Sequence, residues 1–213
     1  MLRNLVDPLK EMGHEVILFD FDLQPYSRHG NVRNERDVQW QAQNRERLTE
    51  AVLSQVRRAH EQGGLDVFLS HFWDAHVEPE VIKEIGALGI ATVNWFCNGS
   101  YQLYLVEKIA PAYDYILVPE RFRVEDYRKL GANPLFFPEA ANPSYYRPIE
   151  GTSLKHDVTF VGQCYGERIN YAAQLHRAGI QFSAFGPQWE ELAQRDCKLM
   201  RRLKLSPPVY AAR

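Results

Sequence analysis

The chain has 213 residues, 45% of them hydrophobic, which suits one large domain or two small ones. Its formal net charge of −2 argues against a nucleic-acid or membrane-surface role, since either would need a basic excess. No apolar run approaches the roughly 18 residues of a membrane span, and the first residues lack the apolar core of a signal peptide. Cys97, Cys164 and Cys197 fit neither a zinc spacing nor a disulfide framework. We therefore expect a cytoplasmic protein with three free thiols and no nucleic-acid partner.

Apolar periodicity predicts a regular alternation of helices and strands along the first two thirds of the chain. The expected helices cover residues 2–12, 37–62, 79–88, 101–110 and 121–130, and the expected strands cover 15–21, 66–71, 90–96, 115–118 and 135–137. Residues 22–36 are polar and rich in turn formers, which predicts a loop. The alternation indicates an α/β fold, a Rossmann-like parallel sheet with helices on both faces.

The predicted order opens on a helix, whereas a doubly wound domain normally opens on a strand. The chain is then either a fragment or a fold that begins with a helix. We favour the fragment because the far end also stops early, with only two strands in the last predicted sheet.

Residues 139–155 carry no periodicity and divide the chain. We expect an N-terminal domain at 1–141, a linker at 142–155 and the start of a second Rossmann-like domain at 156–213. A strand at 157–161, a helix at 168–178 and a strand at 181–185 form one predicted βαβ unit, and a further helix is expected at 189–203.

The turn between the first strand and the helix of this unit is the strongest candidate site. Gly162, and Gly186 after the second strand, allow close backbone approach, Arg168 can bind a phosphate in a forked geometry, and Tyr165 lies between them. The alternative is an ordinary strand-to-helix turn with a surface arginine, and a lone pair of glycines is a weak signal.

Three further candidates follow predicted strands of the first domain or its end, where ligands of parallel sheets bind. Asn98 and Ser100 could hydrogen-bond a sugar, or they could cap a helix. His71 could be a general base, while a metal site made with its neighbours Asp74 and His76 is less favoured than polar loop chemistry. Glu139 and Asn142 could line a ligand cleft, or they could form a hinge turn.

Four spaced segments carry a family resemblance. They read YDYILVPERFRVEDYRKLGA, LFFPEAANPSYYRP, HDVTFVGQCYGER and FSAFGPQW. Together they resemble the glycosyltransferases related to spore maturation protein CgeB, which have the two-Rossmann-domain architecture called GT-B. The resemblance runs from about residue 90 to residue 210.

The resemblance implies an acceptor-side N-terminal domain, a donor-side C-terminal domain and an active cleft between them. The substrates would be a nucleotide-sugar donor and an unknown glycan, protein or small-molecule acceptor, with no metal or other cofactor. Gly162 and Arg168 would face the donor diphosphate, and His71 is named only as a guess for the base. Because both ends fit a piece of a longer protein, we expect residues 1–213 to be inactive alone. The rival hypotheses are a non-catalytic nucleotide- or glycan-binding or partner-docking module and, more weakly, a flavodoxin-like sensor.

Overall fold

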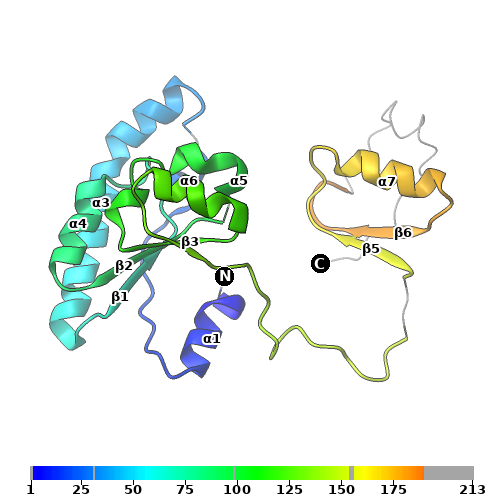
Figure 1. Cartoon of the computed structure of the whole chain (residues 1–213), viewed down its shortest axis with the longest axis horizontal. Helices are drawn as coiled ribbons and strands as arrows, with labels where there is room; N and C mark the ends of the chain where they lie inside the picture. Colours follow the sequence, from blue (N-terminus) through cyan, green and yellow to red (C-terminus); the bar gives the residue numbers. More distant parts are fainter. Residues whose placement is uncertain (1, 31, 98, 154–155, 190–213) are drawn as a thin grey trace. The chain divides into compact units, whose positions relative to one another are not determined.

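The computed structural model describes residues 2–30, 32–97, 99–153 and 156–189. The chain divides into two compact units, Met1–Arg147 and Pro148–Arg213. The division falls inside the segment 142–155, where the sequence loses its periodicity. Figure 1 shows the helices and strands of both units.

The first unit contains a parallel sheet, and its four strands in the described part of the chain pair in sequence order. They are β1 (Val67–Ser70), β2 (Ala91–Trp95), β3 (Tyr115–Val118) and β4 (Pro134–Phe136). The register sets Leu69 opposite Val93, and Val93 opposite Tyr115. Because every pairing is parallel and helices connect the strands, the unit is Rossmann-like, as the sequence predicts.

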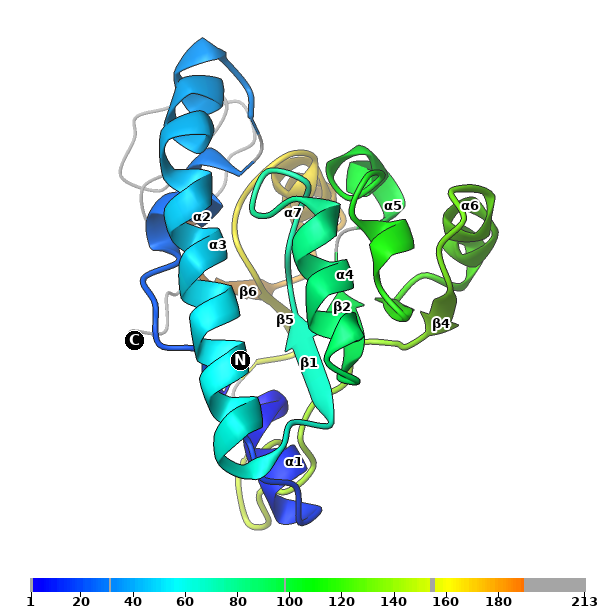
Figure 2. The ribbon, with the colours of Figure 1, turned by 90° about the vertical axis from the view of Figure 1, so that its left-hand side faces the viewer.

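Two helices cover one face of this sheet and supply much of the core. These are α3 (Glu35–Gly63) and α4 (Pro79–Ala87), which stand on either side of the β1 arrow in Figure 2. Asn34 caps α3, its side chain accepting a hydrogen bond from the Asp37 N–H. The predicted stripe of α3 is buried at Leu48, Val52 and Val56. Residues of β2 and β3 that point to the same face are buried as well, namely Thr92, Asn94, Ile116 and Val118.

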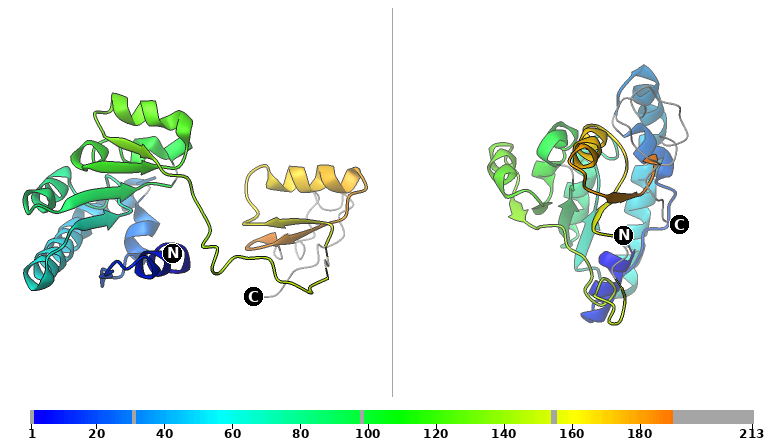
Figure 3. Two further views of the ribbon diagram at one scale, coloured as in Figure 1. Left: turned by 60° about the horizontal axis from the view of Figure 1, so that its bottom comes forward. Right: turned by 90° about the vertical axis from the view of Figure 1, so that its right-hand side faces the viewer.

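The remaining elements of the first unit are short. They are η1 (Leu2–Asn4), α1 (Val6–Glu11), α2 (Gln24–His29), α5 (Gly99–Gln102), η2 (Leu103–Leu105), η3 (Ala110–Ala112), η4 (Arg121–Arg123) and α6 (Val124–Lys129). Figure 3 shows α1 apart from α3 and α4, on the other side of the sheet.

Three sequence predictions for this unit are wrong. The expected strand at 15–21 is an extended segment that belongs to no sheet, and the expected loop at 22–36 contains α2. The expected helix at 101–110 breaks into α5 and η2. It breaks because the loop after β1 takes its backbone groups: the Asp74 carboxylate accepts hydrogen bonds from the N–H groups of Lys108 and Ile109, and the Leu105 carbonyl accepts one from the Asp74 N–H.

The second unit shows the predicted βαβ arrangement. β5 (Val158–Val161) pairs in parallel with β6 (Phe182–Phe185), and α7 (Arg168–Arg177) connects them. Its small core contains Ala172, Ala184 and Trp189. The helix predicted at 189–203 lies, apart from Trp189, outside the described residues.

Among the described residues, no helix is both long and apolar enough to cross a membrane.

Candidate functional site

The carboxyl edge of the first sheet brings together residues that the sequence analysis named separately. All four strands run in the same direction, so the residues that follow β1, β2, β3 and β4 lie along one edge. His71 directly follows β1, and Glu139 follows β4 by three residues. Asn98, two residues beyond Phe96, and the Ser100 side chain lie outside what the structure describes.

A buried polar network fixes the loop after β1. Asn94 is fully buried; its amide donates to the Phe72 carbonyl at 2.9 Å, and its side-chain oxygen accepts from the Phe72 N–H at 2.8 Å. Ser70 donates to the same oxygen of Asn94, and its hydroxyl lies 2.8 Å from the Tyr113 hydroxyl. Arg45 donates to the carbonyls of Asp74 and Ala75 farther along the loop. The loop is therefore held in one conformation by hydrogen bonds from Asn94 of β2 and Arg45 of α3.

His71 occupies an aromatic pocket at this edge. Its ring meets the rings of Trp73 and Phe96 edge-on, with centroids 6.3 and 6.0 Å away. Burial lowers the pKa of His71, so the imidazole is neutral near pH 7. Its Nε2 is buried without a hydrogen-bond partner among the described residues.

The neighbouring Asp74 and His76 serve the loop itself. The Asp74 carboxylate caps the backbone at Lys108 and Ile109. His76 stacks on Trp73, and its Nδ1 accepts a hydrogen bond from the Trp73 N–H. No group of three His, Cys, Asp or Glu side chains among the described residues could hold a metal ion.

Two carboxylates stand near a thiol at the ends of the middle strands. Burial, and then the charges of Glu139 and Glu120, raise the pKa of Cys97 to about 11. One oxygen of Glu120 is buried without a hydrogen-bond partner among the described residues. Sequence reasoning missed Glu120, although its place two residues after β3 was a usable signal.

Asn142 is part of a turn that fastens the chain to its own amino-terminal segment. Its amide donates to the Arg3 carbonyl at 2.9 Å, and its side-chain oxygen accepts from the Ser144 N–H at 2.9 Å. The Asn142 N–H donates to the Asn4 side chain. With 6% of its surface exposed, Asn142 has the surroundings of a structural residue, the alternative that the sequence left open.

In the second unit, two glycines let the ends of β5 and β6 meet. Gly162 has a φ of 157° and Gly186 a φ of 131°. A Cβ on Gly186 would lie 2.5 Å from the Gly162 carbonyl oxygen, closer than packed atoms allow. That same oxygen accepts a hydrogen bond from the Trp189 indole at 2.8 Å. Glycine at position 186 is therefore a steric requirement.

The turn from Gly162 to Arg168 presents backbone donors ahead of α7. Gly162 and Cys164 donate to the carbonyls of Phe185 and Pro187 across the strand ends. The N–H groups of Gln163, Tyr165, Gly166 and Glu167 have no acceptor among the described residues. Several N–H groups in a turn before a helix are a suitable arrangement for an anion.

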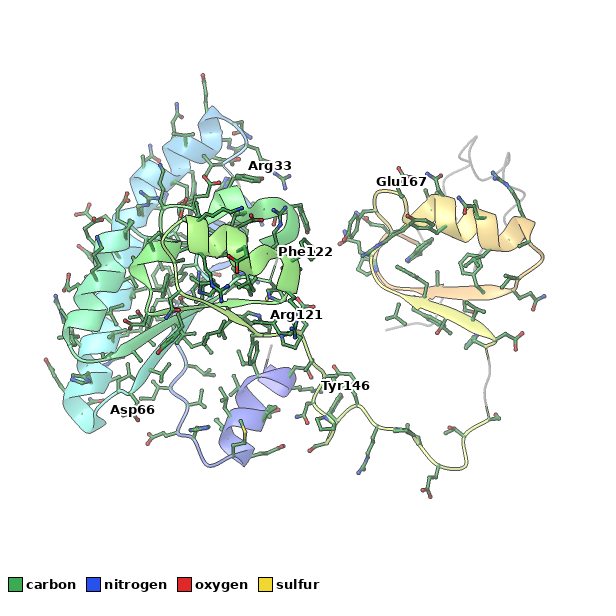
Figure 4. The ribbon with its side chains drawn as sticks, viewed as in Figure 1. Arg33, Asp66, Arg121, Phe122, Tyr146 and Glu167 are labelled. Atoms are coloured by element: carbon green, nitrogen blue, oxygen red, sulfur yellow. The ribbon has the colours of Figure 1, made fainter. Side chains whose placement is uncertain are left out.

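Arg168 lies on this turn and helps to shape it. Its guanidinium donates to the Gln163 carbonyl at 2.7 Å and lies 4.0 Å from the centre of the Tyr165 ring. The Phe160 ring is 5.4 Å away. Tyr165 is exposed, and Glu167, labelled in Figure 4, stands at the start of α7. The positive group is thus already beside the unpaired N–H groups.

A comparison with protein-family models finds no match to this chain, and a comparison with curated proteins finds none either. The assignment of function therefore depends on the geometry and chemistry of these two sites.

Proposed function

We propose that the protein is a glycosyltransferase of the GT-B class that uses a nucleoside diphosphate sugar as its donor. The observation that carries the proposal is the turn after β5, where four backbone N–H groups without acceptors among the described residues precede α7 and the Arg168 guanidinium stands beside them. A diphosphate oxygen could accept hydrogen bonds from several of these N–H groups at once. The helix dipole and the arginine would add favourable charge.

The proposed reaction transfers the sugar from the diphosphate to the acceptor hydroxyl. The bond between the anomeric carbon and the diphosphate breaks, and the acceptor hydroxyl oxygen forms a new bond to that carbon. The turn would stabilise the negative charge that develops on the leaving diphosphate, which is the electrostatic part of the catalysis.

The proton of the acceptor hydroxyl must pass to a base. The carboxyl edge of the first sheet supplies candidates in His71 and Glu139. His71 is neutral near pH 7, as a base must be, and its Nε2 is buried without a hydrogen-bond partner among the described residues. Glu139 is an exposed carboxylate. We propose His71 as the base, and Glu139 is the alternative residue for this role.

A non-catalytic nucleotide- or glycan-binding module is the second candidate, and one observation favours it. The Arg168 guanidinium is already engaged by the Gln163 carbonyl and the Tyr165 ring, so its role could be to hold the turn in shape. A binding module of this kind would turn over no nucleotide sugar, and Arg168→Ala would affect its ligand binding alone.

The proposal is tested by the thermal melting of the chain with UDP, GDP, ADP and TDP, each with and without magnesium. A ligand at 100 times its Kd stabilises the folded state by about 2.7 kcal/mol, so a bound diphosphate raises the melting temperature. We expect one diphosphate to act, equally well without magnesium, and Arg168→Ala to abolish most of the shift. Arg177→Ala, at the other end of α7, is the matched control and should keep the shift. No shift with any diphosphate in a protein that melts cooperatively would contradict the proposal.

A further inference from the structure

The open edge of the first sheet, at β1, carries an inference that is independent of the proposed function. β1 pairs with β2 on one side and with no other described strand. The Ala91 N–H donates to the Asp66 carbonyl, and alternate residues of a parallel ladder face the same neighbour. The N–H and C=O groups of Val67 and Leu69 therefore face the open edge.

A second set of unpaired backbone groups lies beyond this edge. Residues 14–20 are extended, and the N–H and C=O groups of Glu15 to Phe19 have no partner among the described residues. Figures 2 and 3 place this segment beyond β1, on the side away from β2, and both run in the same direction. The segment is held at its end, because the Gln55 side chain binds both the N–H and the C=O of Asp20.

Both segments carry apolar side chains, and several of these side chains are exposed to solvent. Residues 15–19 read EVILF and β1 reads VFLS, which is the composition of strands buried in a parallel sheet. Yet Ile17 is 56% exposed, Leu18 54% and Val67 49%. The backbone groups on this side of the sheet thus have no partner among the described residues, and several of the apolar side chains are largely exposed.

We propose that this edge is a docking site for one extended, apolar strand, which pairs with β1 on one side and with residues 15–19 on the other. The unpaired donors and acceptors of Val67 and Leu69 match those of a parallel strand. Glu15 and Asp66, both exposed, stand at the amino ends of the two flanking segments, and Figure 4 shows Asp66 at the start of β1. A lysine or arginine at the first position of a parallel strand would complement these charges.

The test joins such a strand covalently to the full chain. The link gives the strand a high effective concentration at the edge, so that even weak binding is detected. The extension ahead of Met1 consists of one lysine, five β-branched residues and a short glycine-rich turn. We expect amide hydrogen exchange at Val67, Leu69 and Ile17 to slow by about tenfold or more. A control extension of equal length, with proline at alternate positions, cannot form the ladder and should leave exchange unchanged.

A second variant, Val67→Pro, tests whether the backbone donors of β1 bind the added strand. The Val67 N–H faces away from β2, so this substitution removes a donor at the open edge and leaves the ladder to β2 in place. In this variant the lysine-led extension should no longer protect Leu69. Equal exchange with both extensions would overturn the proposal. Protection of the unextended chain that rises with protein concentration would overturn it too, because the edge would then be occupied by a second copy.

Discussion

The α-carbon of Gly186 lies so close to the Gly162 carbonyl that an added Cβ would come within 2.5 Å of the oxygen. This approach closes the ends of β5 and β6 and, with the indole bond from Trp189 to the same oxygen, fixes where the turn before α7 begins. The backbone donors of the proposed diphosphate site depend on this contact.

Gly186→Ala should destabilise the second unit by at least about 2 kcal/mol, because both its φ and the space around it exclude a side chain. Hydrogen exchange at β5 and β6 measures the loss. Gly179→Ala is the matched control: its φ is also positive, but nothing lies within 4 Å of its Cβ. That variant should cost about 1 kcal/mol. Equal losses in the two variants would show that the contact is unimportant.

Asn94→Ala should destabilise the first unit by about 3 kcal/mol, because it leaves the buried N–H and C=O groups of Phe72 unpaired. Urea unfolding gives the change in free energy. Asn133 also donates to a backbone carbonyl, but it is exposed, so Asn133→Ala should cost less than about 1 kcal/mol. If both variants unfold at the same urea concentration, the network around Phe72 is not what holds the loop.

Stability should fall in acid through His76. Burial lowers the pKa of His76 to about 4, whereas in the unfolded chain it titrates near the ordinary 6.5. The unfolded state therefore binds a proton first as the pH falls, and stability present above pH 6.5 is lost between pH 6.5 and about 4. The expected loss is about 3 kcal/mol.

Urea unfolding across this pH range measures the effect. His76→Gln should show a flatter pH profile than the unsubstituted protein, whatever its stability at neutral pH. His14→Gln, at an exposed position, should keep the original slope. If the pH profile of His76→Gln is as steep as that of the unsubstituted protein, groups other than His76 cause the loss of stability in acid.

Cys97 should react slowly with iodoacetamide. Its pKa of about 11 leaves only a small fraction of thiolate at pH 8. Glu139→Gln removes one of the charges that raise the pKa and should speed the alkylation, while Glu167→Gln in the second unit should not. Mass spectrometry of the Cys97 peptide follows the rate. If Glu139→Gln is alkylated at the same rate as the unsubstituted protein, the Glu139 charge does not raise the pKa of Cys97.

The sheet and the βαβ unit could be read from the sequence because their signals are local. Short apolar runs mark β1 to β3 and β5, and the stripe at Leu48, Val52 and Val56 marks α3. The segment 15–21 was misread for a physical reason. Its composition is that of a buried strand, but a strand also needs a neighbour to pair with, and composition does not show whether one is present.

The site residues were harder to predict, because their roles depend on contacts distant in sequence. The position of Asn142 at the junction suggested a cleft or a hinge, while its bonds to Arg3 and Asn4 span the length of the first unit. Arg168 begins α7, as its spacing predicts. Its contacts with the Gln163 carbonyl and the Tyr165 ring could not be read from spacing alone.

The most direct test of the proposed function is an NMR titration of the chain with UDP, GDP, ADP and TDP that follows the backbone amides of residues 162–168. We expect one diphosphate to shift the amide signals of Gln163, Tyr165, Gly166 and Glu167, without magnesium, and Arg168→Ala to weaken this binding about tenfold or more. Signals of the turn that stay unchanged at saturating concentrations of all four diphosphates would contradict it.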